Sequence, residues 1–314
     1  MQQRFTMRSA RAFAPGGIGN LGPGLDILGC AVTGPGDSVR ATRSERPGVF
    51  IEETGHADLP SDPDRHASGI AAADVLRRAR SEFGVVLHIT KGLPLSGGQG
   101  GSAASAVAGA VATNAVLGSP LEREELLFAA LAAEERLAGR HIDNLAPSLF
   151  GGILLIHSIV PLRVDALPVP SALRIVLVHP TMQLRTADAR AVLPDTVPRS
   201  VALAQAAAVG AMIAAFCTGE LHRLRGAVVD RIAEPVRAPL LPGFLEAKQA
   251  ALDAGALGCS ISGGGPSAFA LTDSNESAAD ILRAMVHAYA ARGMTAEGRV
   301  AEVDTRGAHI EADE

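Results

Sequence analysis

The residue types best suited to chemistry lie in one glycine-rich segment, residues 94–105, which reads PLSGGQGGSAAS. It follows residues 85–90, predicted as a strand, and leads into the Ala-rich residues 102–117, predicted as a helix. Glycines let a backbone adopt positive φ angles and come close to an anion. The first amides of a helix lack partners within it, and the helix dipole is positive at that end. The segment is therefore predicted to hold a polyphosphate, and the alternative is a flexible loop with Ser102 as a plain N-cap.

Positive charge for phosphate chemistry is scarce around this segment. A Walker A motif needs a lysine before the helix, whereas Gly101 precedes Ser102 here. The whole chain has only two lysines, Lys91 and Lys248. A protein-kinase fold is excluded because its lysine, HRD and DFG motifs are missing. Arginines, backbone dipoles and a divalent cation would therefore supply the charge, with hydroxyl groups from Ser102 and Ser105 as further donors.

Two other glycine-rich segments occur in the chain. Residues 15–26 contain a literal GxGxxG from Gly17 to Gly22, but a proline and a glycine follow at once, where a dinucleotide site needs a helix. This segment is interpreted as a tight loop that presents Asn20 and Asp26, and the alternative is that both only cap local turns. Residues 261–267, taken alone, are typical of a plain loop.

Composition limits the possible function classes. The 314 residues are 47% hydrophobic and 19% charged, which excludes a disordered chain. A net charge of -5 and 3% aromatic residues argue against nucleic-acid binding. The three separated cysteines form no CxxC pair, which suggests a reducing compartment. Residues 200–219 are the most membrane-like stretch but are predicted as a buried or half-buried core helix, so a soluble cytoplasmic protein is expected.

Short β-rich runs alternate with Ala-rich helical stretches, which predicts an α/β or α+β protein. Strands are predicted at residues 48–53, 85–90, 153–159, 174–179, 267–272 and 298–303. Helices are predicted at residues 102–117, 122–137, 186–193, 199–217, 221–232, 243–254 and 276–292. The three prolines in residues 161–170 predict a turn or exposed connection. A domain break is expected at Gly151-Gly152, which would give domains of residues 1–151 and 152–314.

In this order and spacing, the three glycine-rich segments resemble the GHMP kinase superfamily. Four further stretches resemble its homoserine kinase family: Asn20-Leu21-Gly22-Pro23-Gly24 with Asp26, His141-Ile142-Asp143-Asn144-Leu145-Ala146-Pro147, Thr186 and Arg190 before Leu193-Pro194, and Glu234-Pro235 with Arg237 before Pro242-Gly243. The resemblance covers most of the chain. It implies a two-domain α+β fold, with an N-terminal domain of ribosomal protein S5 domain 2 type and a ferredoxin-like C-terminal domain.

The resemblance also implies an activity, the phosphorylation of the L-homoserine hydroxyl by ATP in threonine biosynthesis. Magnesium would bridge the β- and γ-phosphates. The residues implied to contact ATP are Pro94, Leu95, Ser96, Gly97, Gly98, Gln99, Gly100, Gly101, Ser102, Ala103, Ala104 and Ser105, with His66 on the adenine side. The implied magnesium ligands are Glu134, or its neighbour Glu135, and Ser102. A homodimer is implied by the resemblance alone.

Homoserine carries an ammonium and a carboxylate, so the implied substrate contacts divide by charge. The residues that suit its ammonium and hydroxyl end are Asp26, Asn20, Asp143 and His141. Arg190 and Arg237 suit the carboxylate, because a guanidinium group binds carboxylates with a planar fork. The alternatives are a structural histidine tied to Asp143 and arginines that are solvated surface charges.

Asn144 stands where other superfamily members place an aspartate base, and an amide accepts no proton at neutral pH. Catalysis is therefore expected through positioning and charge neutralisation, with Arg190 and Thr186 as the other catalytic residues.

The chain also departs from the family pattern. Gly97 and Gly101 replace common serines, Gln99 replaces a leucine, and His66 replaces a frequent asparagine. Two other hypotheses remain open: a kinase for another small alcohol, and a catalytically weak ligand-binding relative.

Overall fold

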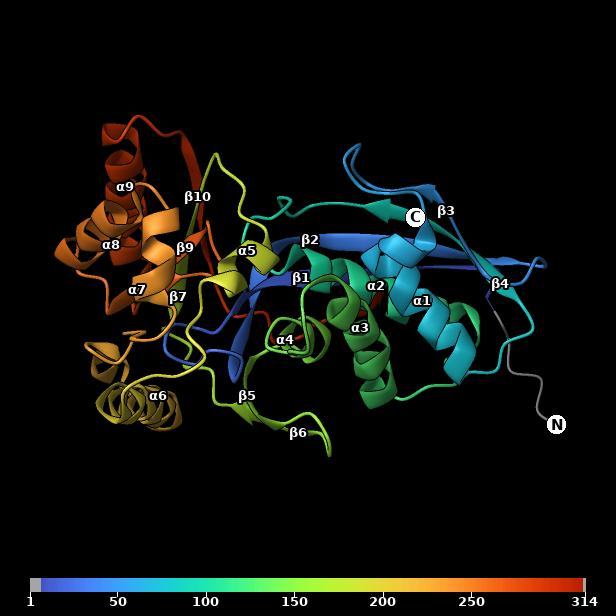
Figure 1. Cartoon of the computed structure of the whole chain (residues 1–314), viewed down its shortest axis with the longest axis horizontal. Coiled ribbons are helices and arrows are strands. Elements are labelled where there is room, and N and C mark those ends of the chain that lie inside the picture. Colours follow the sequence, from blue (N-terminus) through green and yellow to red (C-terminus); the bar gives the residue numbers. More distant parts are fainter. Residues whose placement is uncertain (1–6, 313–314) are drawn as a thin grey trace.

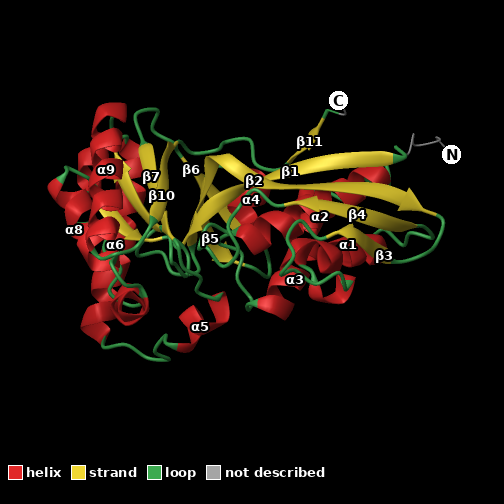
Figure 2. Ribbon diagram, turned by 90° about the horizontal axis from the view of Figure 1, so that it is seen from above, coloured by secondary structure: helices red, strands yellow, loops and turns green. Residues whose placement is uncertain are grey.

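The computed structural model describes residues 7–312, which form two sheets with helices packed against them (Figures 1 and 2). The larger sheet contains β1 (Ser9–Gly19), β2 (Leu28–Ser44), β3 (Val49–Glu53), β4 (Gly84–Thr90), β5 (Ile153–Ser158), β6 (Arg163–Leu167) and β11 (His309–Glu311). Its order is β11-β1-β2-β4-β3, and β5 joins β2 to β6. β3 and β4 are parallel, and the other neighbouring pairs are antiparallel.

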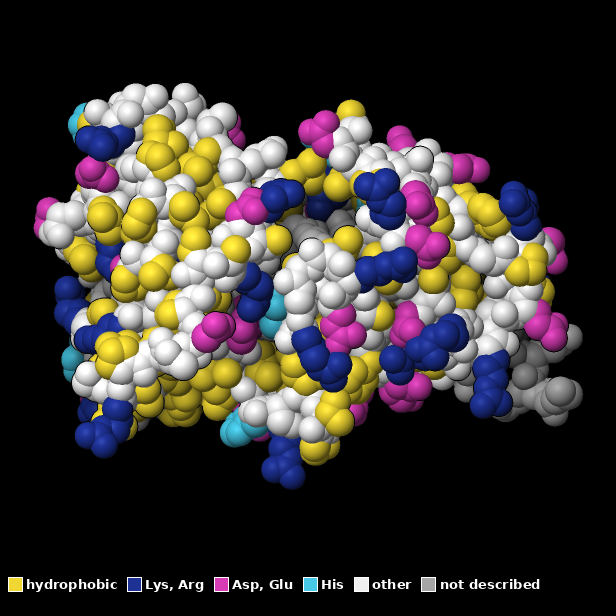
Figure 3. Space-filling view, in the orientation of Figure 1, with side chains coloured by type: hydrophobic (Ala, Val, Ile, Leu, Met, Phe, Trp, Pro, Cys, Tyr) yellow, Lys and Arg dark blue, Asp and Glu magenta, His cyan; other side chains and the backbone are white. Residues whose placement is uncertain are grey.

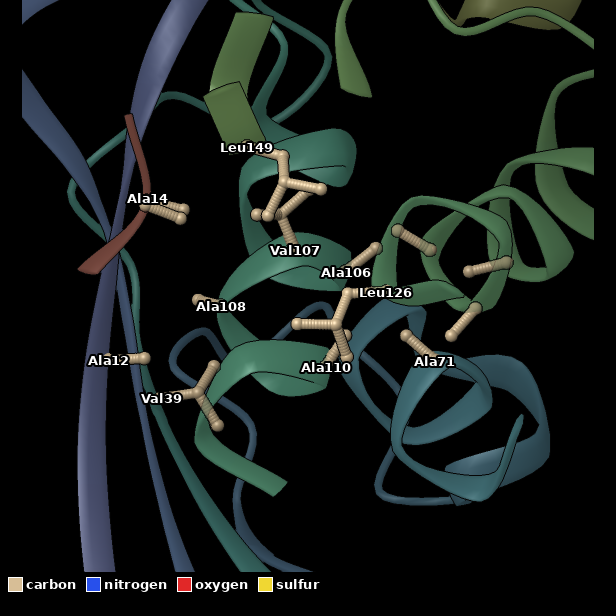
Figure 4. Close-up of a cluster of buried hydrophobic side chains, with 14 of the residues drawn as sticks. Ala12, Ala14, Val39, Ala71, Ala106, Val107, Ala108, Ala110, Leu126 and Leu149 are labelled. Carbon is tan, nitrogen blue, oxygen red and sulfur yellow. The ribbon is translucent and has the colours of Figure 1, made fainter. Parts of the chain in front are cut away.

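Helices α1 (Ala67–Arg78), α2 (Gly101–Val116), α3 (Arg123–Leu137) and α4 (Leu145–Phe150) pack together against this sheet. Their shared core is rich in alanine, and Figure 4 shows Ala12 of β1 and Val39 of β2 beside the buried side chains of α2. Small side chains let the helices approach closely, since a Cβ atom at Gly109 of α2 would lie 2.9 Å from the Cα of Ser68 in α1. This packing fixes the start of α2 between the sheet and α1.

The smaller sheet contains β7 (Arg174–Pro180), β8 (Gly258–Ile261), β9 (Ala268–Thr272) and β10 (Ala296–Ala301), all antiparallel in the order β10-β7-β9-β8. β7 contributes side chains to two hydrophobic cores, because successive side chains on a strand point to opposite faces. Ile175 and Leu177 pack towards α6 (Arg199–Thr218), whereas Val176 and Val178 pack towards α8 (Phe244–Asp253) and α9 (Asn275–Ala291).

Short elements complete the chain. They are α5 (Thr186–Ala191), α7 (Glu234–Arg237), and the 3-10 turns η1 (Pro63–Arg65), η2 (Leu221–Leu224) and η3 (Ala238–Leu240). Figure 1 shows α5 between the two halves of the molecule. α5 is therefore placed to contribute side chains to the space between the sheets.

Most predicted elements are confirmed, with ends that shift by a few residues. The helix predicted at residues 221–232 is wrong: only η2 forms, and the chain turns away at Gly226, whose φ is +76°. The carboxylate of Asp230 then accepts the amides of Ile232, Ala233 and Glu234, so it caps the entry to α7 instead of continuing a helix.

Three further differences have local causes. Residues 161–170 were expected to be a connection, but β6 forms there and pairs with β5, and the prolines at 161, 168 and 170 fall outside the strand. β1 was not predicted, because its inward side chains are mainly alanines and a bulge interrupts its pairing after Pro15. β2 was not predicted, because Gly34, Pro35 and Gly36 interrupt its apolar pattern. The tight loop expected at residues 15–26 therefore begins as strand and turns only after Gly19.

Three strands that follow the expected domain break belong to the larger sheet. β5 and β6, which follow residue 152, belong to the larger sheet, and β11 from the C-terminal end pairs with β1. The division into residues 1–151 and 152–314 stays a prediction.

α6 is the one helix in the described part of the chain that is long and apolar enough to span a membrane. Its inner face, including Met212 and Phe216, packs in the core beside β7, while 28% of its apolar window is buried. It therefore packs by one face only and is less buried than the buried or half-buried core helix that the sequence predicts.

Candidate active site

The three glycine-rich segments meet in space, although they lie far apart in the sequence. The Gly17 amide donates to the carbonyl of Gln99 at 3.0 Å, and the Gly263 amide donates to the carbonyl of Gly19 at 3.1 Å. The hydroxyl of Ser262 donates to the carbonyl of Gly98 at 2.7 Å. Residues 261–267, which taken alone are typical of a plain loop, therefore form hydrogen bonds with both other segments.

The glycine-rich segment of residues 94–105 leads directly into α2. Gly100 is the N-cap of α2 with a φ of +70°, so the helix begins at Gly101, one residue earlier than predicted. Ser102 is exposed in the first turn, and the alternative in which it caps the helix is wrong. The first residues of α2 line a cavity of about 440 Å³. Figure 3 shows a hollow between the two halves of the molecule, with Lys and Arg side chains at its rim.

Most of the predicted ATP contacts line this cavity. They are Pro94, Leu95, Ser96, Gly97, Gly98, Gly100, Gly101, Ser102, Ala103, Ser105 and His66. Two predicted residues point elsewhere: Ala104 is buried in the core, and the Gln99 side chain accepts a hydrogen bond from Arg299 at 2.9 Å. Ser105 lies at the cavity wall, but its hydroxyl donates to Asp37 at 2.5 Å.

His66 is buried at the start of α1. Its Nδ1 accepts the Ser68 amide at 3.2 Å, and its Nε2 lies 3.3 Å from the carbonyl of Thr54, so the neutral Nε2–H tautomer satisfies both. Burial lowers the pKa of His66, with smaller opposing contributions from its neighbours. A nucleotide in the cavity would therefore meet the ring rather than a free nitrogen.

Beside the cavity, charged side chains from three separate segments come together. Asp26, in the turn after β1, forms a two-point ion pair with Arg190 of α5, from which Nη1 reaches Oδ2 at 3.3 Å. Asn20 accepts the Asp26 amide at 3.0 Å and donates to the carbonyl of Gly263 at 3.0 Å. Its own amide donates to Oδ2 of Asp143 at 3.1 Å. The predicted ammonium site and one predicted arginine are thus adjacent.

His141 links two acidic residues. Its Nδ1 lies 3.1 Å from Oδ1 of Asp143, and its Nε2 lies 3.5 Å from Oε1 of Glu134. Burial lowers the pKa of His141, but the hydrogen bond and charge of Asp143, together with the charge of Glu134, leave it raised. His141 is thus tied to Asp143 and also lines the cavity, so both its structural role and its contact with the substrate stay predictions.

Glu134 lies on the buried side of α3 and lines the cavity, whereas Glu135 pairs with Arg140 at 2.5 Å. Burial raises the pKa of Glu134, and His141 and Arg190 partly offset this effect. Oε2 of Glu134, Nε2 of His141 and Oδ1 of Asn144 are buried without hydrogen-bond partners among residues 7–312. Each such group costs about 1–3 kcal/mol when left unsatisfied, so a ligand that pairs with these atoms would gain that free energy.

Arg237 is 3% exposed, so it is not a solvated surface charge. It donates to the carbonyls of Ala189 at 3.0 Å and Gly263 at 3.1 Å, and burial lowers its pKa. Thr186, the first residue of α5, and Asn144 both line the cavity. Gly19 leaves room for the Asn144 side chain, because a Cβ atom at Gly19 would lie 2.5 Å from Nδ2 of Asn144.

Sequence reasoning missed three basic residues at the cavity: Lys91, Arg65 and Arg185. Arg65 and Arg185 stand on short segments with no periodic signal. Two features of the sequence could have identified Lys91: it is one of only two lysines in the chain, and it directly precedes the loop.

Comparison with known proteins places this fold in one class. The family model described as "GHMP kinases N terminal domain" matches residues 67–152, and "GHMP kinases C terminal" matches residues 212–291. Solved structures with 17–18% identity, a mevalonate kinase from L. major and a galactokinase from Lactococcus lactis, share the fold with TM-scores of 0.70.

Relatives with higher identity extend over nearly the whole chain. A homoserine kinase of Chlorobium phaeovibrioides is 42% identical and covers 97% of this chain and 100% of the relative. A homoserine kinase of Arabidopsis thaliana is also 42% identical, over 96% of this chain and 84% of the relative. The crystal structure of homoserine kinase from Cytophaga hutchinsonii has a TM-score of 0.92 at 39% identity, with 97% and 98% of the two chains covered. The chain therefore belongs to the GHMP kinase family, in the branch that contains the homoserine kinases.

Proposed function

We propose that the protein is a homoserine kinase, which transfers the γ-phosphoryl group of ATP to the hydroxyl of L-homoserine and so serves threonine biosynthesis. The observation that carries this proposal is the pairing of two unlike sites. The start of α2, whose first amides have no partner within the helix, lines a cavity of about 440 Å³, and a charged cluster of Asp26, Arg190 and Asp143 lies beside it, joined to the cavity wall through His141. The homoserine kinase relatives support the same activity.

The triphosphate is proposed to lie over residues 97–102, where the backbone supplies hydrogen-bond donors and the positive end of the helix dipole. Arg65 at the cavity adds positive charge, whereas Arg185, which also lines it, forms a two-point ion pair with Asp188 at 2.8 Å. The adenine then points towards His66, Leu59 and Leu95, which line the other part of the cavity. Hydrophobic contact with the base therefore complements polar contact with the phosphates.

The acceptor site is proposed to bind a zwitterion. In the structure, Asp26 and Arg190 neutralise each other. An amino acid can replace this pair with two pairs, because its ammonium takes Asp26 and its carboxylate takes Arg190, with Arg237 nearby as a further positive charge. Neither protein charge is then left unpaired, which would be strongly unfavourable in a partly buried site. A neutral alcohol offers no such exchange, so the site favours amino acids.

The phosphoryl transfer is proposed to proceed without a protein base. Asn144, whose Oδ1 has no partner in the described part of the chain, can accept a hydrogen bond from the substrate hydroxyl and orient it. The hydroxyl proton then passes to the phosphoryl group or to water, while Arg190 and Thr186 face the developing charge. An Asn144→Asp variant is expected to be no faster, and a rate higher by orders of magnitude would contradict this mechanism.

Magnesium fits the residues at the cavity. The unpartnered Oε2 of Glu134 is a carboxylate oxygen, the ligand type that Mg²⁺ prefers, and the exposed hydroxyl of Ser102 lines the same space. When bound, the ion would neutralise charge on the β- and γ-phosphates. A second acidic cluster, Asp26, His141 and Asp143, has ligand atoms within 4.8 Å of one another. Because Asp26 is already paired with Arg190, this cluster suits the substrate ammonium better than a metal ion.

The activity is tested by coupled detection of ADP release from purified protein with Mg²⁺ and ATP. Homoserine-dependent turnover, with O-phosphohomoserine as product, supports the proposal. Turnover with another alcohol and none with homoserine would move the protein to a different substrate. Nucleotide binding without any turnover would instead support a catalytically weak, ligand-binding relative. That hypothesis is based on Gly97 and Gly101, which replace common serines of the family.

We also propose that the protein is a cytoplasmic homodimer that binds neither nucleic acid nor membrane. The outer face of α6 supports association with a second copy, because it is apolar and Leu203 on it is 65% exposed. The net charge of -5 disfavours nucleic acid. Light scattering after gel filtration tests the dimer: twice the mass of 32.1 kDa is expected, and a monomer at all concentrations would refute it.

A further inference from the structure

A buried ionic cluster lies directly beneath the start of α2. Asp37 of β2 is completely buried, and its Oδ1 accepts the amides of Gly92 at 3.1 Å and Leu93 at 3.3 Å. Its Oδ2 accepts the Ser105 hydroxyl and the Lys91 ammonium. One carboxylate therefore ties together β2, the entry to the glycine-rich segment and the first turn of α2.

Lys91 is fully occupied in this cluster. Its ammonium contacts Asp37, the Gly101 carbonyl at 3.1 Å and the Ser105 hydroxyl at 2.9 Å. An ammonium group has three donors, so these contacts use all of them. The side chain is 7% exposed. Although Lys91 is the lysine next to the phosphate site, it is not free to bind phosphate.

The position of the cluster gives it an electrostatic consequence. Lys91 and Ser105 both line the cavity, and a Cβ atom at Gly101 would lie 3.5 Å from the Lys91 ammonium. Without Lys91, the Asp37 carboxylate would stand uncompensated below the helix start that faces the triphosphate. Interior charges are weakly screened, so such a carboxylate would repel an anionic ligand.

We propose that Lys91 is a positioning residue that neutralises Asp37, so that the buried carboxylate can hold the phosphate loop in place without repelling the nucleotide. This inference rests on the proposed binding of ATP over residues 97–102. It also assigns the Ser105 hydroxyl to the support of the loop instead of to phosphate. Neither role was visible in the sequence, where Asp37 and Lys91 are 54 residues apart.

Three variants separate charge neutralisation from a merely structural role. Lys91→Met leaves a negative charge, Asp37→Asn removes it, and the double variant is neutral again, like the wild-type pair. We measure the Kd of Mg²⁺·ADP by calorimetry, and the KM values for ATP and homoserine. Lys91→Met should weaken ADP binding by about tenfold or more, the size expected for one nearby charge at an effective dielectric constant near 20. Asp37→Asn should bind ADP at least as tightly as the wild type, and the double variant within about threefold of it.

The outcomes are distinguishable. If both single variants weaken ADP binding and the double variant is weaker still, the cluster is only structural and the inference is wrong. If Lys91→Met does not fold, the double variant and Asp37→Asn still give the decisive comparison. Lys248→Met is the matched control, because Lys248 pairs with Glu234 far along the chain and should affect stability alone. If the wild-type protein binds no nucleotide, the proposed function fails, whatever the variants show.

Discussion

The two halves of the candidate site are built in different ways. The nucleotide side consists mainly of the backbone of one continuous segment, whose glycines and helix start present amides to the cavity. The acceptor side consists of side chains that arrive from distant segments, such as Asp26 and Arg190, which are 164 residues apart. Backbone donors suit any polyphosphate, whereas placed charges select one substrate. The binding of ATP and the choice of acceptor should therefore respond to different mutations.

The largest effect is expected where the two halves meet, at Glu134. Glu134→Gln keeps the shape of the side chain and removes the charge of the proposed Mg²⁺ ligand. The kcat should fall on the order of 10²- to 10³-fold, and more Mg²⁺ should be needed for half-maximal rate. Steady-state kinetics at varied Mg²⁺ measure both quantities.

Glu135→Gln is the control for this prediction, because Glu135 is the neighbouring carboxylate and pairs with Arg140 outside the cavity. Its kinetics should match those of the wild type. Equal losses in the two variants would show that Glu134 has no special role.

The next largest effect is expected on the acceptor side. Asp26→Asn removes the charge while keeping a residue type that tolerates the positive φ of +61°. The kcat/KM for homoserine should fall about 10²-fold, because the substrate ammonium loses its partner and Arg190 is left uncompensated. The KM for ATP should stay unchanged, as it should in an Asp195→Asn control at an exposed position. A rise in the KM for ATP that matches the loss for homoserine would contradict the division between the two halves.

A smaller effect is expected from crowding the backbone-built half. Gly98 has a φ of +74°, and a Cβ atom there would lie 2.6 Å from the carbonyl oxygens of Ser262 and Gly265. Gly98→Ala should therefore displace the loop and raise the KM for ATP about tenfold. Gly219→Ala provides the control, since Gly219 has a φ of +73° in open space. It should lower the free energy of unfolding by about 1 kcal/mol without changing the kinetics. Similar kinetics in both variants would show that the loop tolerates displacement.

The smallest effect is expected from restoring a missing hydroxyl. At Gly101 a Cβ atom would make ordinary contacts, the nearest at 3.5 Å, so a serine fits without rearrangement. Gly101→Ser should lower the KM for ATP about threefold, the effect of one modest hydrogen bond to phosphate. Gly101→Ala should leave this KM unchanged. If serine and alanine behave alike, the departure from the family pattern at this position has no effect on nucleotide binding.

The same contrast explains what the sequence predicts. The strand, glycine segment and helix around residues 85–117 are contiguous, so local propensity predicts them to within a residue or two. The contact between Asp26 and Arg190 depends on tertiary folding, and only the resemblance to a family identified both residues. β1 was missed because its inward alternation uses small residues such as Ala10, Ala12 and Ala14. The buried partnership of Asp37 with Lys91 had no sequence signal, because neither its burial nor its geometry is encoded locally.

The most direct test of the account is a crystal structure with Mg²⁺, a non-hydrolysable ATP analogue and L-homoserine. We expect the phosphates to accept hydrogen bonds from the backbone amides of residues 97–102, the homoserine ammonium to contact Asp26, and its carboxylate to contact Arg190. A nucleotide bound away from the start of α2, or homoserine bound with Asp26 and Arg190 still paired to each other, would contradict it.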